Sequence, residues 1–310
     1  MPIDPKLRAL LDSLPPAPPL DQVTPDQVRA HIQKMVAGME FPDLPQVRTQ
    51  DVEIPAPAGV IPARVYSAGG AEPAPVIVHF HGGGWVVGSL ETHDPFCRYL
   101  CGLTQAVIVS VDYRLAPEHK FPAAVEDAEA ATLWVLEHAA ELGGDAKRVF
   151  VSGDSAGGNL AATVALLLRG KATLRGQLLL FPATDGAPEE YASYQSNATG
   201  YGLEAVSMRW YIGQYLAGEE QRSDPRFAPV RASDLSGLPP ALVMTGEYDV
   251  LRDEGIRYAE RLTEAGVAVT HIHYGRMHHN FAVWPLTVAA LPQSFEARRE
   301  MAEWVRQTAQ

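Results

Sequence analysis

The chain has 310 residues, of which 46% are hydrophobic, and its formal net charge at pH 7 is −12. This length and apolar content suit one large domain or two small ones with a sizeable core, and an acidic chain without a stripe of Lys or Arg argues against nucleic-acid binding. The chain lacks the ~20 apolar residues of a membrane span and begins without a signal-peptide pattern, so we expect a cytoplasmic protein with no stable membrane insertion.

Two helical segments open the chain. Apolar residues recur at helical spacing over residues 5–14, and the prolines of 15–19 then break the pattern. Thr24-Pro25-Asp26-Gln27 has the capping residue, the first-position proline and the third-position Gln of a helix start. We expect this second helix to run to about residue 38, before Pro42 and Pro45.

Strand patterns begin near residue 47. Two alternating segments flank Gly59 as in a hairpin, and six short apolar runs follow, which are typical of buried parallel strands. Helical patterns alternate with these runs, which predicts a mostly parallel sheet with helices on both faces. The hairpin strands are 52–54 and 61–66; the runs are 75–80, 107–112, 149–152, 177–181, 241–245 and 267–274; the helices are 122–140, 156–169, 253–265 and 293–310.

One segment interrupts the alternation. Residues 184–235 carry no good strand pattern but include a helical pattern over 204–216. We expect this segment and the N-terminal helices of 1–45 to form a cap. The core would then comprise residues 46–183 and 236–310.

The motif Gly153-Asp154-Ser155-Ala156-Gly157 follows the pattern G-x-S-x-G. An apolar strand precedes it and an Ala-rich helical pattern follows, which is the strand–turn–helix context that a nucleophilic serine requires. The small flanking glycines permit a sharp, strained turn, and the helix start directs backbone N–H groups toward developing negative charge. This context favours Ser155 as a nucleophile over an incidental serine in a glycine-rich turn.

The sequence His81-Gly82-Gly83-Gly84-Trp85 directly follows a predicted strand. Three consecutive glycines cost backbone entropy, and an oxyanion hole explains them, because its N–H groups must reach the substrate oxygen without an intervening Cβ. We expect the N–H groups of Gly83 and Gly84 to act with that of Ala156. The loop fits neither phosphate-binding glycine pattern.

The general base and its acid are sought at the ends of later strands, in the chain order serine, acid, histidine. Asp249 follows the strand 241–245 and is the preferred acid, with Glu247 and Asp253 as alternatives. His278 and His279 follow the next strand and compete as the base, which must contact both the serine and the carboxylate.

A zinc site is the competing interpretation of the histidines. His271 and His273 share one face of a strand and lie near His278 and His279 in the sequence, but they complete no recognised metal pattern. Cys97 and Cys101 are one helical turn apart and match neither a redox pair nor a zinc site. We therefore expect no metal and two small, buried thiols in a reducing compartment.

Together these motifs resemble the hormone-sensitive-lipase branch of bacterial carboxylesterases, also called family IV. Besides the serine motif and the glycine loop, the resemblance rests on Asp112-Tyr113-Arg114-Leu115-Ala116-Pro117-Glu118 and Asp249-Val250-Leu251-Arg252-Asp253-Glu254-Gly255. It implies an α/β-hydrolase fold with an eight-stranded, mostly parallel sheet and a helical cap, and it assigns the acid to Asp249. The family's His-Gly-Phe aligns with His279-Asn280-Phe281, which assigns the base to His279 although Asn replaces Gly. Arg114 and Glu118 would support the glycine loop.

The resemblance implies a carboxylesterase that hydrolyses short- to medium-chain esters through an acyl-enzyme. Ser155, His279 and Asp249 would form the triad, without a metal or an organic cofactor. An amidase or other acyl hydrolase and a non-catalytic ligand-binding homologue are the alternatives; such receptors lose the histidine that is present here. The expected partner is a small ester, and a homodimer is possible for the family. Aromatic residues that could line the pocket are Trp85, Trp210, Tyr211, Tyr215 and Phe281.

Overall fold

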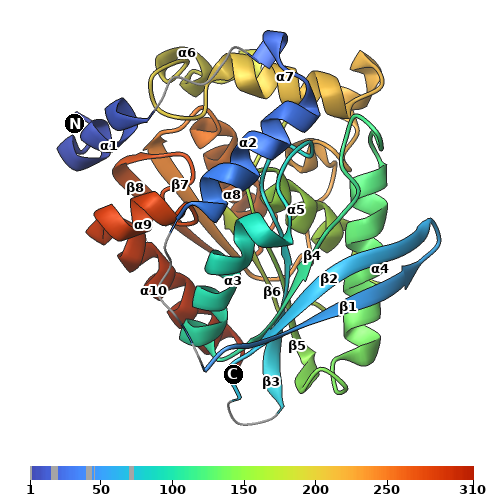
Figure 1. Ribbon diagram of the computed structural model, residues 1–310. Helices are drawn as coiled ribbons and strands as arrows, with labels where there is room; N and C mark the ends of the chain where they lie inside the picture. The colour runs from blue at the N-terminus through green and yellow to red at the C-terminus, as the bar shows by residue number, and fades with distance from the viewer. Residues whose placement is uncertain (1, 15–19, 40–43, 45, 70–72) are drawn as a thin grey trace.

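An eight-stranded sheet runs through the computed structural model, in the order β1-β2-β4-β3-β5-β6-β7-β8 (Figure 1). β2 pairs antiparallel with β1 and β4, and the remaining pairs are parallel. The strands are β1 (Arg48–Ala56), β2 (Gly59–Ser67), β3 (Ala74–Phe80), β4 (Val107–Val111), β5 (Gly144–Asp154), β6 (Gly176–Leu180), β7 (Ala241–Tyr248) and β8 (Val269–His278). The predicted mostly parallel sheet is confirmed.

The structure describes residues 2–14, 20–39, 44, 46–69 and 73–310. The break predicted at the prolines of 15–19, and the helix-ending prolines at 42 and 45, lie outside these residues. The helices are α1 (Pro5–Ser13), α2 (Pro25–Ala37), α3 (Leu90–Thr104), α4 (Ala123–His138), α5 (Ala156–Leu168), α6 (Ser193–Ser196), α7 (Ala205–Tyr215), α8 (Arg252–Glu264), α9 (Pro285–Ala290) and α10 (Pro292–Thr308).

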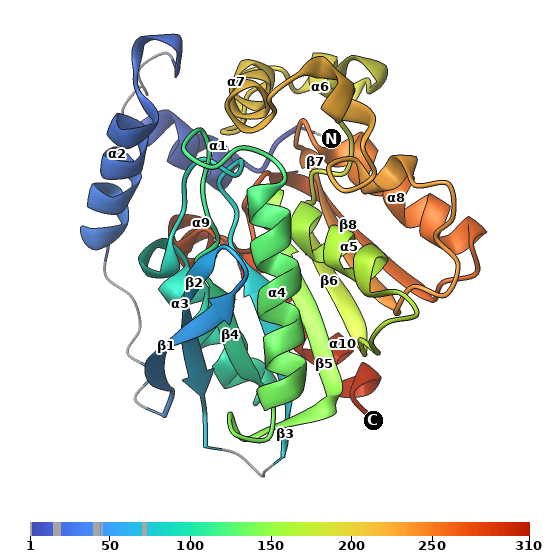
Figure 2. The same ribbon diagram turned by 90° about the vertical axis from the view of Figure 1, so that its right-hand side faces the viewer.

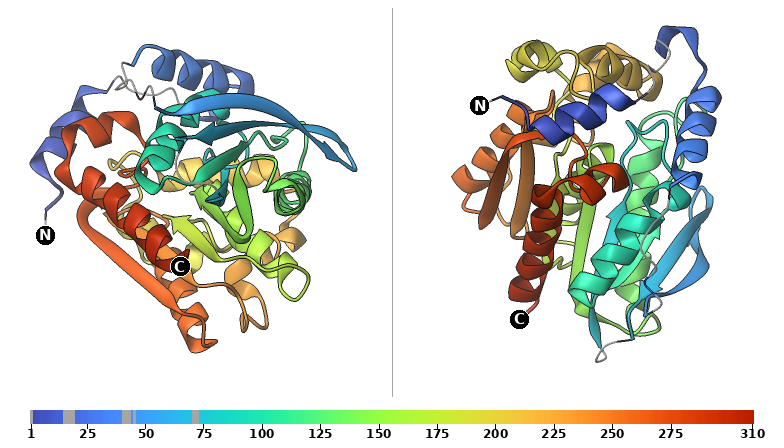
Figure 3. Two further views of the ribbon diagram at one scale, coloured as in Figure 1. Left: turned by 90° about the horizontal axis from the view of Figure 1, so that it is seen from below. Right: turned by 60° about the vertical axis from the view of Figure 1, so that its left-hand side comes forward.

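The helices form layers around the sheet. Figure 2 shows α4, α5 and α8 on one face and α3 and α10 on the other, and the view from below shows the sheet enclosed between them (Figure 3). In β3, Val76 and Val78 pack into the core on the side of α4 and α5, whereas Ile77 packs into the core on the side of α3 and α10. This alternation is the two-residue period of a strand whose faces are both covered.

The helices α2, α6 and α7 lie beyond the carboxyl ends of the parallel strands (Figure 2). α2 begins at the predicted capping box, in which the Thr24 side chain accepts the N–H of Gln27 and the Gln27 side chain accepts the N–H of Thr24. For α3 the sequence indicates no more than the one-turn spacing of Cys97 and Cys101. This helix begins at a second capping box, between Ser89 and Thr92. Cys97 and Cys101 lie on it as free, buried thiols.

A buried carboxyl group joins α8 to the chain that follows β6. Glu254 is fully buried, its Oε2 accepts the N–H of Asp185 at 3.2 Å, and its backbone carbonyl accepts the hydroxyl of Thr184 at 2.9 Å. Burial, together with the negative charges of Asp185 and Asp249, raises the pKa of Glu254 well above its ordinary value. The folded chain therefore holds Glu254 in its neutral form at a pH where the unfolded chain ionises it.

We expect Glu254→Gln to become more stable than the wild type as the pH rises. Below the unfolded-state pKa both states keep the proton, so the free-energy difference between variant and wild type is constant there. Above about pH 5 Glu254 loses its proton in the unfolded chain but keeps it in the folded chain. Relative to the variant, the free energy of unfolding of the wild type then falls by about 1.4 kcal/mol per pH unit until the folded-state pKa is reached. Gln has no proton to lose.

Urea unfolding of both proteins at pH 5, 6 and 7 measures this difference. The exposed Glu260→Gln change on the same helix is the control and should leave the pH dependence unaltered. If the free energies of unfolding of the wild type and Glu254→Gln changed in parallel with pH, Glu254 would be ionised in the folded protein.

Candidate active site

Four strand ends bring the predicted site residues to one edge of the sheet. β3 ends at Phe80 before the glycine loop, β5 ends directly before Ser155, β7 ends directly before Asp249, and β8 ends directly before His279. Because these strands are parallel, their carboxyl ends share an edge, which is where sites form in open α/β sheets. Segments more than 190 residues apart in the chain thus meet in one place.

The backbone of Ser155 occupies a conformation that L-residues rarely adopt. Its φ is +54° and its ψ is −118°, in the single residue between β5 and α5. Its N–H donates to the carbonyl of Leu180 on β6 at 2.9 Å, and its carbonyl accepts the N–H groups of Asn159 and Ala183. Neighbouring elements therefore hold the strained turn, as is typical of functional residues in unfavourable backbone conformations.

Asp249 and His279 form a buried pair. The Oδ2 of Asp249 lies 2.8 Å from the Nδ1 of His279, and its Oδ1 accepts the N–H of Leu251 at 2.9 Å. Both side chains are almost fully buried, and the ring of Phe181 meets the imidazole edge-on at 4.9 Å. Because an ionised carboxylate only accepts hydrogen bonds, Nδ1 carries a proton and the neutral ring has its lone pair at Nε2.

The alternative acids and the alternative base have other partners. Glu247 accepts the N–H of Arg276 at 2.6 Å, and Asp253 accepts the N–H of Ser193 at 2.7 Å. The Nδ1 of His278 faces the carbonyl of Tyr201 at 3.3 Å. Burial, together with the neighbouring His279, lowers the pKa of His278 to about 4, so it is neutral at pH 7.

Asn280 explains how this chain departs from the His-Gly-Phe pattern. Its φ is +63°, in the left-handed region that glycine adopts without strain. Asn is among the few other residues that tolerate this conformation, because its short side chain forms local hydrogen bonds. The substitution therefore preserves the turn after His279.

The glycine loop turns sharply beside Ser155. Gly83 and Gly84 have φ values of +127° and +59°, and the carbonyl of Gly83 accepts the N–H groups of Val86 and Val87. The N–H of Gly82 donates to Oδ1 of Asp154 at 3.0 Å. Ala156 is the first residue of α5, where an N–H has no partner within its own helix.

Gly84→Ala should lower kcat/KM by about 10²- to 10³-fold, the usual cost of losing one oxyanion donor. A Cβ at this position would overlap the ring of Tyr211, and φ +59° is unfavourable for alanine, so the loop must move. Ester hydrolysis at saturating and limiting substrate measures the loss. A Tyr211→Ala background removes the overlap with the ring and leaves only the close contact with the Cβ of residue 211, at 2.8 Å, so the same change should cost less there. An equal cost in both backgrounds would contradict the steric explanation.

A cavity of about 350 Å³ lies over these groups. Gly83, Gly84, Ser155 and His279 line it, whereas Asp249 lies behind His279. The polar part of its remaining lining includes Thr92, His93, Asp154, His278 and Asn280. The apolar part, which is the larger part, comes mostly from the N-terminal helices, from the segment before and along α7 and from the segment after β8: Leu11, Leu14, Ile32, Met35, Val36, Leu203, Met208, Tyr211, Val283 and Trp284. Helical periodicity predicts that such faces are buried but does not indicate what they contact.

Of the aromatic residues predicted to line the pocket, Tyr211 does so. Trp85 and Tyr215 lie in the core instead, with their rings stacked at 4.8 Å, and Phe281 packs against Phe181 beneath His279. The ring centroids of Trp210 and Tyr211 lie 5.2 Å apart, but Trp210 is not part of the cavity lining. These four residues are not part of the lining of this cavity, since large aromatic side chains fill cores as readily as pockets.

Arg29 joins α2 to the core beside the glycine loop. Its guanidinium donates to the carbonyl of Val86 at 2.8 Å and to Glu118 at 2.7 Å. The hydrogen bond from Arg29 to Glu118, together with the positive charge of Arg29, holds the pKa of Glu118 at about 2. Glu118 therefore contacts the end of the loop through Arg29, whereas Arg114 pairs with Asp127 on α4 at 2.8 Å.

Two of the four histidines considered for zinc share one hydrogen-bond partner. His271 and His273 both contact the hydroxyl of Thr245 at 3.0 Å. Among the described residues, no three His, Cys, Asp or Glu side chains are grouped so that they could hold a metal ion. None of the helices in the described ranges is long and apolar enough to cross a membrane.

The chain is similar to several characterised proteins. It is 44% identical over 261 residues to the carboxylic ester hydrolase LipN of Mycobacterium tuberculosis, which covers 82% of this chain and 69% of that protein. Esterase LipI of the same organism is 40% identical over 301 residues, or 94% of this chain and 92% of the relative. A thermostable esterase from Pseudomonas putida ECU1011 has a solved structure with a TM-score of 0.95 and 39% identity, covering 100% of this chain and 98% of that one.

A family model described as the α/β hydrolase fold matches residues 77–283, from β3 to the segment after β8. This range contains the glycine loop, Ser155, Asp249 and His279. The chain therefore belongs to the α/β-hydrolase fold family, in the hormone-sensitive-lipase-like branch that its motifs predict.

Proposed function

We propose that this protein hydrolyses carboxylic esters with Ser155 as the nucleophile, His279 as the general base and Asp249 as the residue that orients His279. The observation that carries the proposal is one cavity lined by Ser155, His279 and the glycine loop, with Asp249 bound to the far side of the imidazole. Its relatives, the carboxylic ester hydrolase LipN and the esterase LipI, support the reaction class.

Each group has a defined task in this mechanism. Nε2 of His279 takes the proton of Ser155 as Oγ attacks the ester carbonyl, and Asp249 stabilises the resulting imidazolium. The N–H groups of Gly83, Gly84 and Ala156 bind the tetrahedral oxyanion. His279 then returns the proton to the leaving alcohol, and a water molecule activated by His279 cleaves the acyl-enzyme to the acid. The mechanism requires no metal or organic cofactor.

The cavity favours short to medium acyl chains. Its volume of about 350 Å³ is at the small end of the range for ligand pockets, and its lining is mostly apolar. We propose that residues 1–45 and 184–235 act as the cap, because Leu11, Ile32 and Met208 from these segments line the cavity above Ser155. The substrate would thus bind between the cap and the sheet edge.

Hydrolysis of p-nitrophenyl acetate, butyrate and decanoate tests the proposal, with p-nitroanilides of the same acids as the matched amide series. We expect ester turnover with a maximum at acetate or butyrate and much slower anilide turnover. A p-nitrophenyl phosphonate should label Ser155 stoichiometrically, as mass spectrometry of the digested protein would show. Faster anilide than ester turnover would favour an amidase.

A ligand-binding homologue without catalysis gives a different result. Such a protein would bind an ester or its acid without releasing p-nitrophenol, and the phosphonate would leave Ser155 unmodified. The orienting contact between Asp249 and His279 favours catalysis, since a receptor needs neither the base nor the acid.

We also propose a reducing, cytoplasmic location and a homodimer. The free, buried thiols of Cys97 and Cys101 suit a compartment without disulfides. β8 is an edge strand of the sheet, and such an edge can pair with a second copy. Light scattering after gel filtration would measure the mass of the assembly; a monomer at micromolar concentration would contradict the dimer.

A further inference from the structure

The carboxylate of Asp154 lies beneath the glycine loop. Asp154 directly precedes Ser155, is almost fully buried, and accepts the N–H of Gly82 at 3.0 Å through Oδ1. This contact joins the end of β5 to the loop that contains Gly83 and Gly84. The orientation of the Asp154 carboxylate therefore bears on where the N–H groups of the loop point.

His93 contacts the same carboxylate. Its Nε2 lies 3.4 Å from both oxygens of Asp154, and its Nδ1 lies 3.0 Å from Oγ1 of Thr92. His93 also lines the cavity that contains Ser155. Since both ring nitrogens have partners, the ring is suited to hold Asp154 and not to exchange protons with a substrate.

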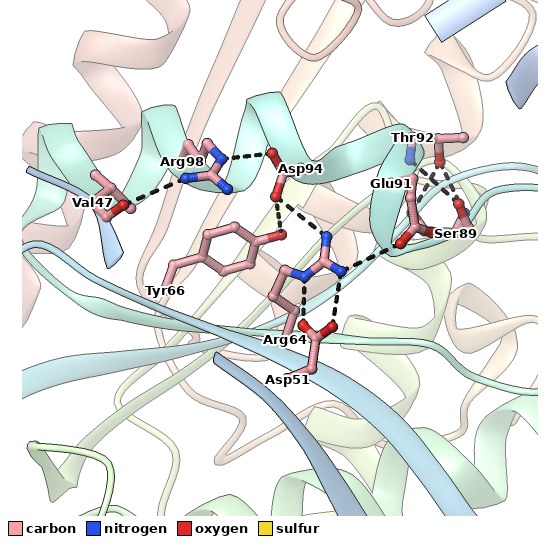
Figure 4. A network of polar contacts seen from close by, with 9 residues as sticks. All are labelled: Val47, Asp51, Arg64, Tyr66, Ser89, Glu91, Thr92, Asp94 and Arg98. Carbon is pink, nitrogen blue, oxygen red and sulfur yellow. Dashed lines mark hydrogen bonds and ion pairs between the residues drawn. The ribbon is translucent and has the colours of Figure 1, made fainter. Parts of the chain in front are cut away.

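The backbone that carries His93 is anchored to the β1–β2 hairpin. Asp94, the next residue of α3, binds Arg98 at 2.6 Å and Tyr66 at 3.1 Å, and also contacts Arg64 of β2 (Figure 4). Arg64 in turn binds Asp51 of β1 at 2.6 Å. These contacts hold the first turns of α3 against the β1–β2 hairpin, so that the imidazole of His93 reaches Asp154 from a well-supported helix.

The charges around Asp154 agree with this arrangement. Burial by itself raises the pKa of Asp154, but His93, with smaller contributions from His79 and His81, outweighs it and holds the pKa at about 2. Burial lowers the pKa of His79 to about 4 and that of His81 to about 3, so both rings are neutral at pH 7. Asp154 is therefore an anion there, and His93 contacts both of its oxygens.

We propose that His93 is a positioning residue for ester hydrolysis, which donates from Nε2 to Asp154 and so orients the carboxylate that holds Gly82 and the oxyanion loop. The inference rests on the proposed function. His93 acts through Asp154 and touches no reacting atom. Its contribution should appear where the oxyanion forms and not in the binding of the ground-state ester.

A matched pair of substitutions tests this role. The amide nitrogen of Gln can take the place of the histidine Nε2, whereas that of Asn takes the place of Nδ1 and cannot reach Asp154. We expect His93→Asn to lower kcat by about 10²-fold, the cost of a small misplacement of catalytic groups, with KM changed less than twofold. His93→Gln should recover most of the activity.

Affinity for a trifluoromethyl ketone provides the second measurement. Oγ of Ser155 adds to its carbonyl carbon, the carbonyl π electrons become the oxyanion, and His279 takes the serine proton, so the adduct occupies the oxyanion hole. Affinity should fall in His93→Asn by the same factor as kcat/KM. In an Asp154→Asn background the change at His93 should have little further effect, because the two residues act together.

The outcomes separate the two proposals. Wild-type protein that neither cleaves esters nor binds the ketone would contradict the proposed function, and this inference with it. Active wild type with equal kcat and ketone affinity in both His93 variants would overturn the role of His93 alone. A rise in KM without a change in kcat would instead assign His93 to the wall of the substrate pocket, and equal losses in the Gln and Asn variants would contradict the Nε2 contact.

Discussion

Replacing Ser155 with Ala should lower kcat for p-nitrophenyl butyrate by about 10⁴- to 10⁶-fold, because nucleophile and base act as a unit. The fold should survive, since Ser155 holds its neighbours through its backbone N–H and carbonyl groups, which alanine retains. Residual hydrolysis above the rate in water would come from the oxyanion hole and substrate binding. Stopped-flow measurement of p-nitrophenol release and phosphonate labelling would both record the loss.

Ser155→Gly is the matched control for the backbone. It removes the same hydroxyl, but glycine adopts φ +54° and ψ −118° without the ~1–3 kcal/mol that other residues lose there. We expect it to be as inactive as the alanine variant and about 1 kcal/mol more stable in urea unfolding. A fully active variant of either kind would show that Ser155 is not the nucleophile.

Asp249→Asn should lower kcat by about 10⁴-fold at pH 7 with little change in structure. The N–H of Leu251 donates to one oxygen of Asp249, so the asparagine must keep its oxygen there and turn its NH₂ toward His279. Nδ1 of His279 must then accept a hydrogen bond, which moves the ring proton to Nε2. That tautomer cannot take the proton of Ser155.

The competing carboxylates provide the controls for this change. Glu247→Gln and Asp253→Asn should keep kcat within about 10-fold of the wild type, because these groups bind the backbone of Arg276 and Ser193 and not the base. A large loss in either variant, with an active Asp249→Asn enzyme, would move the acid to that position.

The active-site candidates were predictable because their signals are local. Ser155 follows an apolar strand and precedes a helix, and the glycines of 82–84 follow another strand. A strained turn and a close backbone approach both restrict which residues can occupy a position, and those restrictions appear directly in the sequence. The parallel sheet followed in the same way from the alternation of strand and helix patterns.

The N-terminal helices show where local patterns stop being informative. The helix starting at Pro25 was predicted from its capping box, which depends on neighbouring residues alone. A cap was expected from the interruption of the strand–helix alternation and from the family resemblance, but the residues that line the cavity from this helix, Ile32, Met35 and Val36, were not singled out. A helical period predicts a buried face but not the surface that buries it.

Local patterns in the chain are enough to predict the sheet, the chain order of the candidate nucleophile, acid and base, and the glycine loop beside them. Which side chains surround these residues depends on long-range packing: Tyr211 lines the cavity while Trp85 and Phe281 fill the core, and His93 reaches Asp154 from α3. The difference lies in how far apart in the chain the contacting residues are. Turns, caps and strand periods depend on residues a few positions apart, whereas a pocket wall depends on contacts between segments distant in the chain, which no local pattern encodes.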